Sequence, residues 1–273
     1  MRIKKTAIVV PTHKGCLEDF EKKSIENNIS ILKNHDIFFI APNRLSYESK
    51  FLELTKNYQL KVQFFDDKYF NNNAGYNKLL ITKNFYKRFL NYDFMLICQL
   101  DVLVFSDELD NWVNKNYDYI GAPWFSNNNG KLKIDSSGNG GFSLRNIKKS
   151  IEVLTSKKLH FNFEKFSNTP LRVGLKYLLL IKLLNKSYFK FLNPIKIVTF
   201  LYSGTEDYFW VFLAKFFVKD FILPEPEMAL KFSFEMYPKH CFELNNQTLP
   251  FGCHAWQKYD RSFWESKMPY LKE

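Results

Sequence analysis

Acidic side chains occur at two places in the sequence where they could take part in catalysis. The first is Asp101, which follows the apolar run Phe94–Cys98 and precedes a second one, Val102–Phe105. A carboxylate in such surroundings is costly unless it is paired, hydrogen-bonded or bound to a cation. Hard divalent ions favour one or two carboxylates together with substrate phosphates. Two interpretations of Asp101 therefore stay open: a metal ligand that holds a diphosphate, or a structural residue that caps a turn.

The second place is the adjacent pair Glu206 and Asp207, which opens a predicted helix with Thr205 as its N-cap. Acids in a first helical turn commonly serve only to complement the helix dipole. Successive side chains on a helix project about 100° apart, so at most one of these carboxylates is expected to face a given substrate. In that position it could act as a general base that deprotonates a hydroxyl.

A glycine run and a histidine are the remaining candidates for a site. The stretch Gly138–Arg145 begins with three glycines in four positions, and bare backbone permits a ligand to approach closely, although a plain tight turn is the alternative. It is neither a Walker loop nor a dinucleotide fingerprint, because both require other spacings. His254, within Pro250–Trp256, is either a packed core residue beside a tryptophan or a metal ligand.

The elements that position these residues follow an α/β pattern over the first hundred residues. Nearly continuous apolar runs alternate with helix-like segments, as in a largely parallel sheet that helices cover on both faces. The predicted strands are Thr6–Val10, Ile37–Ala41, Leu60–Phe65 and Phe94–Leu100. The predicted helices are Glu18–Lys33, Ser46–Lys56 and Ala74–Leu90. Sites in such sheets lie beyond the carboxyl ends of the strands, which directs attention to Pro11–Lys14 and Gln99–Asp101.

The second half of the chain has a different pattern. Tyr117–Trp124 and Gly140–Leu144 are predicted as short strands, and Phe125–Ser137, rich in Asn, Ser and Gly, as a loop. The segment Lys165–Thr205 has no acidic residue, and its lysines recur among apolar residues. It is either a basic amphipathic surface that lies on an anionic membrane or a helical hairpin with a solvated outer face. The lysines that gather on one helical side are Lys176, Lys182, Lys186 and Lys190.

Composition and length exclude several classes of protein. The 273 residues, 46% of them apolar and 18% aromatic, exclude a disordered or collagen-like chain and suffice for one large domain or two intimately packed ones. No apolar run reaches the roughly 18 to 20 residues of a membrane-spanning helix, and the first apolar run is too short for a signal peptide. We therefore expect a cytoplasmic protein with reduced thiols at Cys16, Cys98, Cys241 and Cys253. The net charge of +11 resides mainly in apolar helical segments without a nucleic-acid recognition motif, so no nucleic-acid partner is expected.

Five ordered motifs resemble a bacterial family of proteins of unknown function that is grouped with glycosyltransferases. They are Gln99–Asp101, Tyr117–Trp124, Gly138–Arg145, Glu206–Trp210 and Pro250–Trp256. That family is similar to GT-A glycosyltransferases, and the resemblance covers the chain from about Thr6 to Trp264. It implies one α/β domain with a Rossmann-type mixed sheet flanked by helices. A nucleotide-sugar half would span about 1–115, and an acceptor half about 116–273 with a basic helical insertion at 165–205.

The resemblance also implies roles for single residues. Asp101 matches the metal-contacting acid of the Asp-x-Asp motif, Gln99 replaces the first acid, and His254 would be a further ligand to the metal or diphosphate. Asp207 would be the general base, and Glu206 would bind sugar hydroxyls. The nucleotide-sugar would be contacted or shaped by Pro11, Thr12, His13, Asn77, Lys78, Gln99, Gly140 and Gly141.

The implied activity is transfer of a sugar from a nucleotide-sugar, with UDP as the commonest nucleotide, to a hydroxyl of a surface polysaccharide or lipid-linked glycan. The reaction would invert the anomeric centre with help from Mn²⁺ or Mg²⁺. The basic segment would lie near the inner face of the cytoplasmic membrane. Two other classes stay open. A noncatalytic carbohydrate-binding protein would not need Asp101 and Asp207 together, and a metal-dependent nucleotidyltransferase or hydrolase would release pyrophosphate or a sugar phosphate.

Overall fold

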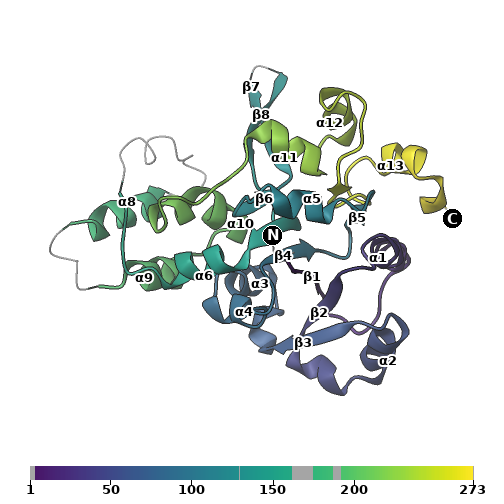
Figure 1. The fold of residues 1–273 in the computed structure, drawn as a ribbon, viewed down its shortest axis with the longest axis horizontal. Coiled ribbons are helices and arrows are strands. Elements are labelled where there is room, and N and C mark those ends of the chain that lie inside the picture. The colour runs from purple at the N-terminus through teal and green to yellow at the C-terminus, as the bar shows by residue number, and fades with distance from the viewer. Residues whose placement is uncertain (1–3, 129, 162–174, 187–191, 273) are drawn as a thin grey trace.

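The computed structural model of the chain describes residues 4–128, 130–161, 175–186 and 192–272. Its largest element is a six-stranded sheet in the order β3-β2-β1-β4-β9-β6 (Figure 1). Its strands are β1 (Thr6–Pro11), β2 (Asp36–Pro42), β3 (Lys61–Phe65), β4 (Phe94–Cys98), β6 (Tyr119–Gly121) and β9 (Phe142–Asn146). The first four run parallel, whereas β9 is antiparallel to both β4 and β6. The expected α/β class, a mixed sheet flanked by helices, is confirmed.

Helices cover both faces of this sheet, as the continuous apolar strands require. On β1, Ala7 and Val9 pack into one core, and Ile8 and Val10 into the other. The described helices are α1 (Asp19–Ile31), α2 (Ser49–Asn57), α3 (Asn73–Leu79), α4 (Lys83–Lys87), α5 (Leu109–Asn114), α6 (Ile147–Thr155), α8 (Leu175–Leu184), α9 (Pro194–Leu201), α10 (Glu206–Tyr208), α11 (Pro226–Phe232), α12 (Pro238–Leu244) and α13 (Arg261–Lys267). Helices α1, α2 and α5 contribute to one core, and α3, α4, α6, α8 and α9 to the other.

Short turns complete the helical content of the described chain. A π-helical turn, Phe209–Leu213, continues directly from α10 and is fully buried. The 3₁₀ turns are Asn43–Tyr47, Asp67–Tyr69, Ala214–Phe216 and Pro269–Leu271. The π-helical turn thus anchors α10, which carries Glu206 and Asp207, in the aromatic core.

Two sequence predictions were wrong in detail. Phe125–Ser137 is not a loop: β7 (Pro123–Asn128) and β8 (Lys131–Ser137) form an antiparallel hairpin. Its turn includes Gly130, whose φ of 79° suits glycine and whose N–H donates to Asn127 Oδ1. The predicted helix Ala74–Leu90 is divided into α3 and α4. The structure describes no continuous helix there because the chain turns at Leu80–Thr82, where the Leu79 carbonyl accepts from the Thr82 N–H.

A small second sheet places two further residues beside the carboxyl end of β4. Its strands, in the order β10-β11-β5, are β10 (Ser233–Phe234), β11 (Gly252–Cys253) and β5 (Leu103–Val104). Because β10 and β11 are parallel, the residues that follow them, Glu235 and His254, emerge at the same edge. The turn between β4 and β5 carries Asp101, so the second sheet brings all three side chains together.

In the described part of the basic segment, the helices α8 and α9 pack against each other, and α9 packs on α6 (Figure 1). Lys176, Lys182 and Lys186 lie in the described residues, whereas Lys190 lies outside them. Among the described residues, no helix combines the length and apolar character needed to cross a membrane. All four cysteines are free, and Cys98 is buried within β4 as the sequence predicts.

Candidate active site

A cavity of about 350 Å³ opens at the carboxyl ends of β1 and β4. Pro11, Thr12 and His13 line it from the end of β1, and Gln99 and Asp101 from the turn after β4. Because the two strands are adjacent and parallel, their ends meet at one edge of the sheet. The remaining lining includes the aromatic side chains of Phe20, Phe70 and Tyr76. The structure therefore brings together five of the residues that the sequence assigns to nucleotide and metal binding.

His254 joins this edge through a network of polar contacts. Its Nε2 lies 3.0 Å from Gln99 Oε1 and 3.4 Å from Asp101 Oδ1. On the other side of the ring, Nδ1 lies 3.0 Å from Glu235 Oε1, which also accepts a hydrogen bond from Asn139 Nδ2 at 2.9 Å. His254 and Asp101, which are distant in sequence, are thus direct neighbours, as the resemblance implies.

Charges in this network shift the pKa values of its members. Burial alone would lower the pKa of His254, but the Asp101 and Glu235 carboxylates raise it to about 10. Burial would likewise raise the pKa of Asp101, but hydrogen bonding and charge from His254 hold it below its usual value. His254 is therefore an imidazolium at neutral pH, and it lies between the carboxylates of Asp101 and Glu235.

The donor set of the network fits a divalent ion that is shared with a substrate. Glu235 on Nδ1 turns Nε2 toward Asp101 and Gln99, which is how carboxylates orient metal-binding imidazoles. No group of three or more His, Cys, Asp or Glu side chains in the described chain is arranged to hold a metal. Asp101 and His254 would therefore supply two ligands, and substrate phosphates and water the others.

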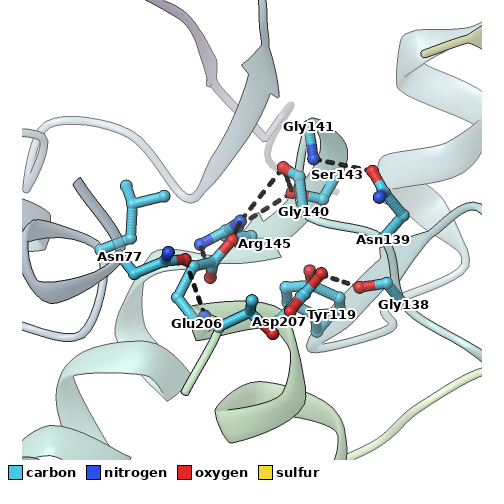
Figure 2. A network of polar contacts seen from close by, with 12 residues as sticks. Asn77, Tyr119, Gly138, Asn139, Gly140, Gly141, Ser143, Arg145, Glu206 and Asp207 are labelled. Carbon is cyan, nitrogen blue, oxygen red and sulfur yellow. Dashed lines mark hydrogen bonds and ion pairs between the residues drawn. The ribbon is translucent and has the colours of Figure 1, made fainter. Parts of the chain in front are cut away.

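A second network lies on the other side of the glycine run, where Arg145 on β9 meets Glu206 at the start of α10. Arg145 Nη1 and Nη2 donate to Glu206 Oε2 and Oε1 at 2.8 and 2.7 Å (Figure 2). Both side chains are at least 95% buried, and Arg145 also donates to Ser143 Oγ. Burial alone would lower the pKa of Arg145, but Glu206 raises it well above its usual value. Both oxygens of Glu206 are engaged within the protein, so the predicted binding of sugar hydroxyls by Glu206 does not agree with this geometry.

The glycine run makes room for these two networks. A Cβ atom on Gly140 would lie 2.1 Å from Glu206 Oε1, and one on Gly141 would lie 2.2 Å from His254 Nε2. Any side chain at either position would displace the carboxylate or the imidazole, since real contacts are never so short. The bare faces of Gly140 and Gly141 are thus covered by protein side chains, which explains the glycines without the predicted contact to a donor sugar.

Asp207 follows Glu206 but lies in a different environment. Its Oδ1 accepts a hydrogen bond from the Tyr208 N–H at 2.8 Å, and Figure 2 shows it beside Tyr119 and Gly138. Burial raises the pKa of its carboxyl group, and the Glu235 carboxylate adds to this effect. Asp207 is therefore close enough to the His254 network to interact with it electrostatically, and it has no bidentate partner of the kind that Glu206 has.

Asn77 and Lys78 occupy structural positions outside the lining of the cavity. Asn77 Oδ1 accepts a hydrogen bond from the Glu206 N–H at 2.9 Å (Figure 2). Lys78 Nζ donates to the backbone carbonyls of Thr199 and Phe200 at the end of α9, the latter at 3.0 Å. The predicted contacts of Asn77 and Lys78 with a nucleotide do not agree with this placement, because both side chains hold other elements of the protein. Their neighbour Tyr76 lines the cavity instead.

Sequence reasoning missed Glu235 and Asn139 and gave Arg145 no role. Glu235 follows Leu230–Phe234, where apolar residues alternate with Lys231 and Ser233 as in a short strand, so the rule that sites follow strand ends, extended to the second half, would have selected it. Arg145 was part of the glycine motif, but nothing in the sequence pairs it with Glu206. Asn139 gave no signal beyond its place among glycines.

The sequence profile of DUF5672, described as a protein of unknown function, matches residues 59–254. The chain belongs to the DUF5672 family. The match includes Asp101, Arg145, Asp207 and His254 but begins after Pro11–His13. No curated protein matches the chain. The membership thus confirms the resemblance to a family of unknown function and leaves the activity to be inferred from the site.

Solved structures that resemble this DUF5672 protein include a xylosyltransferase and a mannosyltransferase. Mouse xyloside xylosyltransferase 1 in its apo form has a TM-score of 0.45 at 11% identity, covering 92% of this chain and 97% of that one. Staphylococcus aureus TarS 1–349 has a TM-score of 0.35 at 10% identity, covering 53% and 48%. The mannosyltransferase PcManGT from Pyrobaculum calidifontis, in complex with GDP-Man and Mn²⁺, has a TM-score of 0.31 at 10% identity, covering 44% of this chain and 36% of that one. The likeness thus spans about half of the TarS fragment and about a third of the mannosyltransferase.

Proposed function

We propose that this DUF5672 protein is a metal-assisted glycosyltransferase. It transfers a sugar from a nucleotide-sugar, with UDP-sugars as the first donors to test, to a hydroxyl of a surface polysaccharide or lipid-linked glycan. One observation carries the proposal: Asp101 lines the cavity together with Pro11–His13, and His254 Nε2 lies 3.4 Å from its carboxylate. A pair of metal-binding side chains beside a cavity of about 350 Å³ suits a nucleoside diphosphate and its divalent ion.

The charges around the glycine run support binding of a cation. Asp101, Glu235, Glu206 and Asp207 supply four carboxylates, against the two cationic groups of Arg145 and His254. When all six are charged, the cluster has an excess of two negative charges. A divalent ion would offset this excess and permit a diphosphate to approach.

The walls of the cavity suit a nucleoside. Phe20, Phe70 and Tyr76 line the cavity, and the asparagines Asn71–Asn73, which also line it, precede Tyr76. Aromatic side chains can stack on a nucleobase, while amide groups can recognise its edges. The base would therefore lie among these side chains, with the diphosphate directed toward Asp101.

In the proposed reaction, Asp207 is the general base. A divalent ion held by Asp101 and His254 Nε2 would neutralise charge on the leaving diphosphate. Glu235 keeps the imidazole oriented through Nδ1. Asp207 accepts the proton of the acceptor hydroxyl as its oxygen bonds to the anomeric carbon and the bond to the diphosphate breaks, which inverts that carbon. Burial raises the pKa of Asp207 and so makes it a stronger base.

The remaining residues position this base. Arg145 on β9 donates hydrogen bonds to the Glu206 carboxylate, and Asn77 Oδ1 accepts a hydrogen bond from the Glu206 N–H. The first turn of α10 is thus held from two sides. Asp207 follows in the same turn. The buried ion pair is therefore a positioning device for the base and contacts no substrate in this mechanism.

A thermal-shift screen with UDP-, GDP-, CMP- and dTDP-sugars, each with Mn²⁺ and with chelator, tests the proposal. A ligand that binds only the folded protein raises its melting temperature. We expect a metal-dependent increase with one nucleotide class and, on adding acceptor glycans, release of the nucleoside diphosphate.

Other products would contradict the proposal and identify another class. Release of pyrophosphate or of a sugar phosphate would indicate a nucleotidyltransferase or hydrolase. Stabilisation by glycans alone, with no effect of any nucleotide or metal, would indicate a noncatalytic carbohydrate-binding protein.

A further inference from the structure

The hairpin of α8 and α9 exposes large apolar side chains. Leu179 and Leu183 on α8 are 52% and 44% exposed, and Phe200 at the end of α9 is 80% exposed, followed by Leu201 at 49%. Tyr177 Oη donates to the Leu201 carbonyl at 3.3 Å, so the start of α8 lies next to the end of α9. These apolar side chains therefore lie on one structural unit, which projects from the body of the protein on the side away from α2 (Figure 1).

The exposed apolar groups are additional to those that hold α8 in place. Tyr177, Leu178 and Ile181 on α8 are buried in the core. Lys176, Leu179 and Leu183 have the helical spacing of a second face, which points away from that core. Helix α8 thus has more apolar side chains than its packing uses.

Lysines are interspersed with these apolar side chains. Lys176, Lys182 and Lys186 are exposed along and just after α8, and Lys196 is exposed on α9. The sequence contains no acidic residue from Lys165 to Thr205, so no acid within this segment offsets the positive charge. At the other end of the hairpin, a cavity of about 270 Å³ is lined by further basic residues, Lys157, Lys158 and His160 among them.

We propose that this surface, the exposed side chains of α8 and α9, docks on an anionic lipid bilayer. Leucine and phenylalanine side chains would enter the boundary between headgroups and acyl chains, while the lysines would lie among anionic headgroups. Charge complementarity favours this occupant. A second copy of the same basic surface would be repelled by it, since the whole chain carries +11.

The docking surface is joined to the candidate active site by few residues. Lys78 binds the Thr199 and Phe200 carbonyls at the end of α9, and the preceding Asn77 binds the Glu206 N–H. Only residues 202–205 separate α9 from α10. Docking would therefore hold α10 close to the bilayer, where a lipid-linked acceptor would reach Asp207. This consequence rests on the proposed function, whereas the docking itself does not.

Sedimentation with vesicles tests the docking directly. We expect the full-length protein to sediment with vesicles of phosphatidylcholine and phosphatidylglycerol at 3:1 and to stay in solution with phosphatidylcholine alone. Substituting Lys176, Lys182 and Lys186 together by Gln should lower the partition coefficient about 100-fold, since each lysine near an anionic surface contributes about fivefold. The matched control substitutes Gln for Lys33, Lys50 and Lys56, which are exposed just after α1 and on α2, away from α8 and α9 (Figure 1), and it should change the partition coefficient less than threefold.

A second variant tests the apolar part without changing any charge. Leu179→Ser with Phe200→Ser should lower binding about tenfold even at high salt, because it removes apolar side chains that would enter the bilayer. Both side chains are exposed, so their replacement should not disturb the core. Circular dichroism melting should match the wild type for every variant. Failure to sediment with anionic vesicles, or equal losses in the two triple-lysine variants, would overturn the proposal. So would a concentration-dependent dimer that the Leu179/Phe200 variant abolishes. None of these readouts depends on transferase activity.

Discussion

Two charged clusters lie on either side of Gly140 and Gly141 and differ in how completely they are paired. Arg145 and Glu206 form two hydrogen bonds with each other and are almost completely buried. His254 and Asp101 approach only to 3.4 Å, and the Asp101 side chain is 34% exposed at the cavity. In the first cluster both carboxylate oxygens of Glu206 are bonded to Arg145, whereas in the second His254 can exchange a proton for a metal ion.

The difference shows that residue type alone does not determine the role of a charged side chain. Glu206 and Asp207 are adjacent acids in one helical turn, yet Arg145 engages the first completely and leaves the second without such a partner. A fully paired buried ion fixes structure, and removing one partner is costly. A partly exposed carboxylate beside a cavity remains available for chemistry. The following substitutions test this division.

The largest expected effect is on stability at the paired cluster. Arg145→Met leaves the Glu206 carboxylate buried without a partner, so the free energy of unfolding should fall by about 3–5 kcal/mol, measured by urea denaturation. Adding Glu206→Met should recover much of this loss, because apolar residues of similar size can replace a buried ion pair. If Arg145→Met cost no more than His254→Gln, the contrast between the clusters would be wrong.

The next effect is on catalysis. Asp207→Asn should lower turnover about 100-fold or more, since it removes the general base, while donor affinity and unfolding free energy stay near wild type. Steady-state kinetics with the donor found in the screen provide the measurement. Asp220→Asn, at an exposed acid paired with Lys149, is the matched control and should retain activity. Full turnover in Asp207→Asn would remove this residue from the mechanism.

Alanine substitutions at Gly140 and Gly141 should affect the two clusters differently. Gly140→Ala places a methyl group against Glu206, and Gly141→Ala places one against His254, each at an expected cost of about 1–3 kcal/mol. Gly140→Ala should have the greater effect on unfolding, because the Arg145 bonds hold Glu206 rigidly. Gly141→Ala should have the greater effect on metal-dependent donor binding. Identical behaviour in both assays would contradict the division.

The smallest effect is expected where a carboxylate only orients the imidazole. Glu235→Gln should weaken Mn²⁺ binding about tenfold, because losing the carboxylate partner of a metal-binding histidine lowers its basicity. Titration calorimetry in the presence of the nucleoside diphosphate would measure it. Glu243→Gln on α12 is the control, and an unchanged affinity in Glu235→Gln would exclude the orienting role.

The parallel half of the fold could be predicted from the sequence, and the antiparallel half only in part. Strands such as Phe94–Cys98 are continuous apolar runs, so their burial on both faces was evident before the structure. The hairpin formed by β7 and β8 was missed although Lys131–Asp135 alternates polar and apolar residues, because the Asn, Ser and Gly residues around it favoured a loop.

The site was predictable where a simple rule of chain geometry applied. The ends of β1 and β4 were selected because parallel strands place their carboxyl ends at one edge. Pairings between distant segments gave no sequence signal, so the Arg145–Glu206 pair and the structural positions of Asn77 and Lys78 became known only from the structure. The resemblance to GT-A enzymes implied that Asp101 and His254 lie near one metal site, but not that Glu235 completes their network.

Calorimetric titration of a UDP-sugar, with Mn²⁺ and with chelator, into wild-type protein and Asp101→Ala is the most direct test of the central claim. That claim is that the edge formed by Asp101 and His254 binds a nucleotide-sugar through a divalent ion. We predict binding by the wild type only with Mn²⁺, and at least a tenfold loss in Asp101→Ala under the same conditions. Equal donor affinity in the two proteins, with and without the metal, would contradict the account.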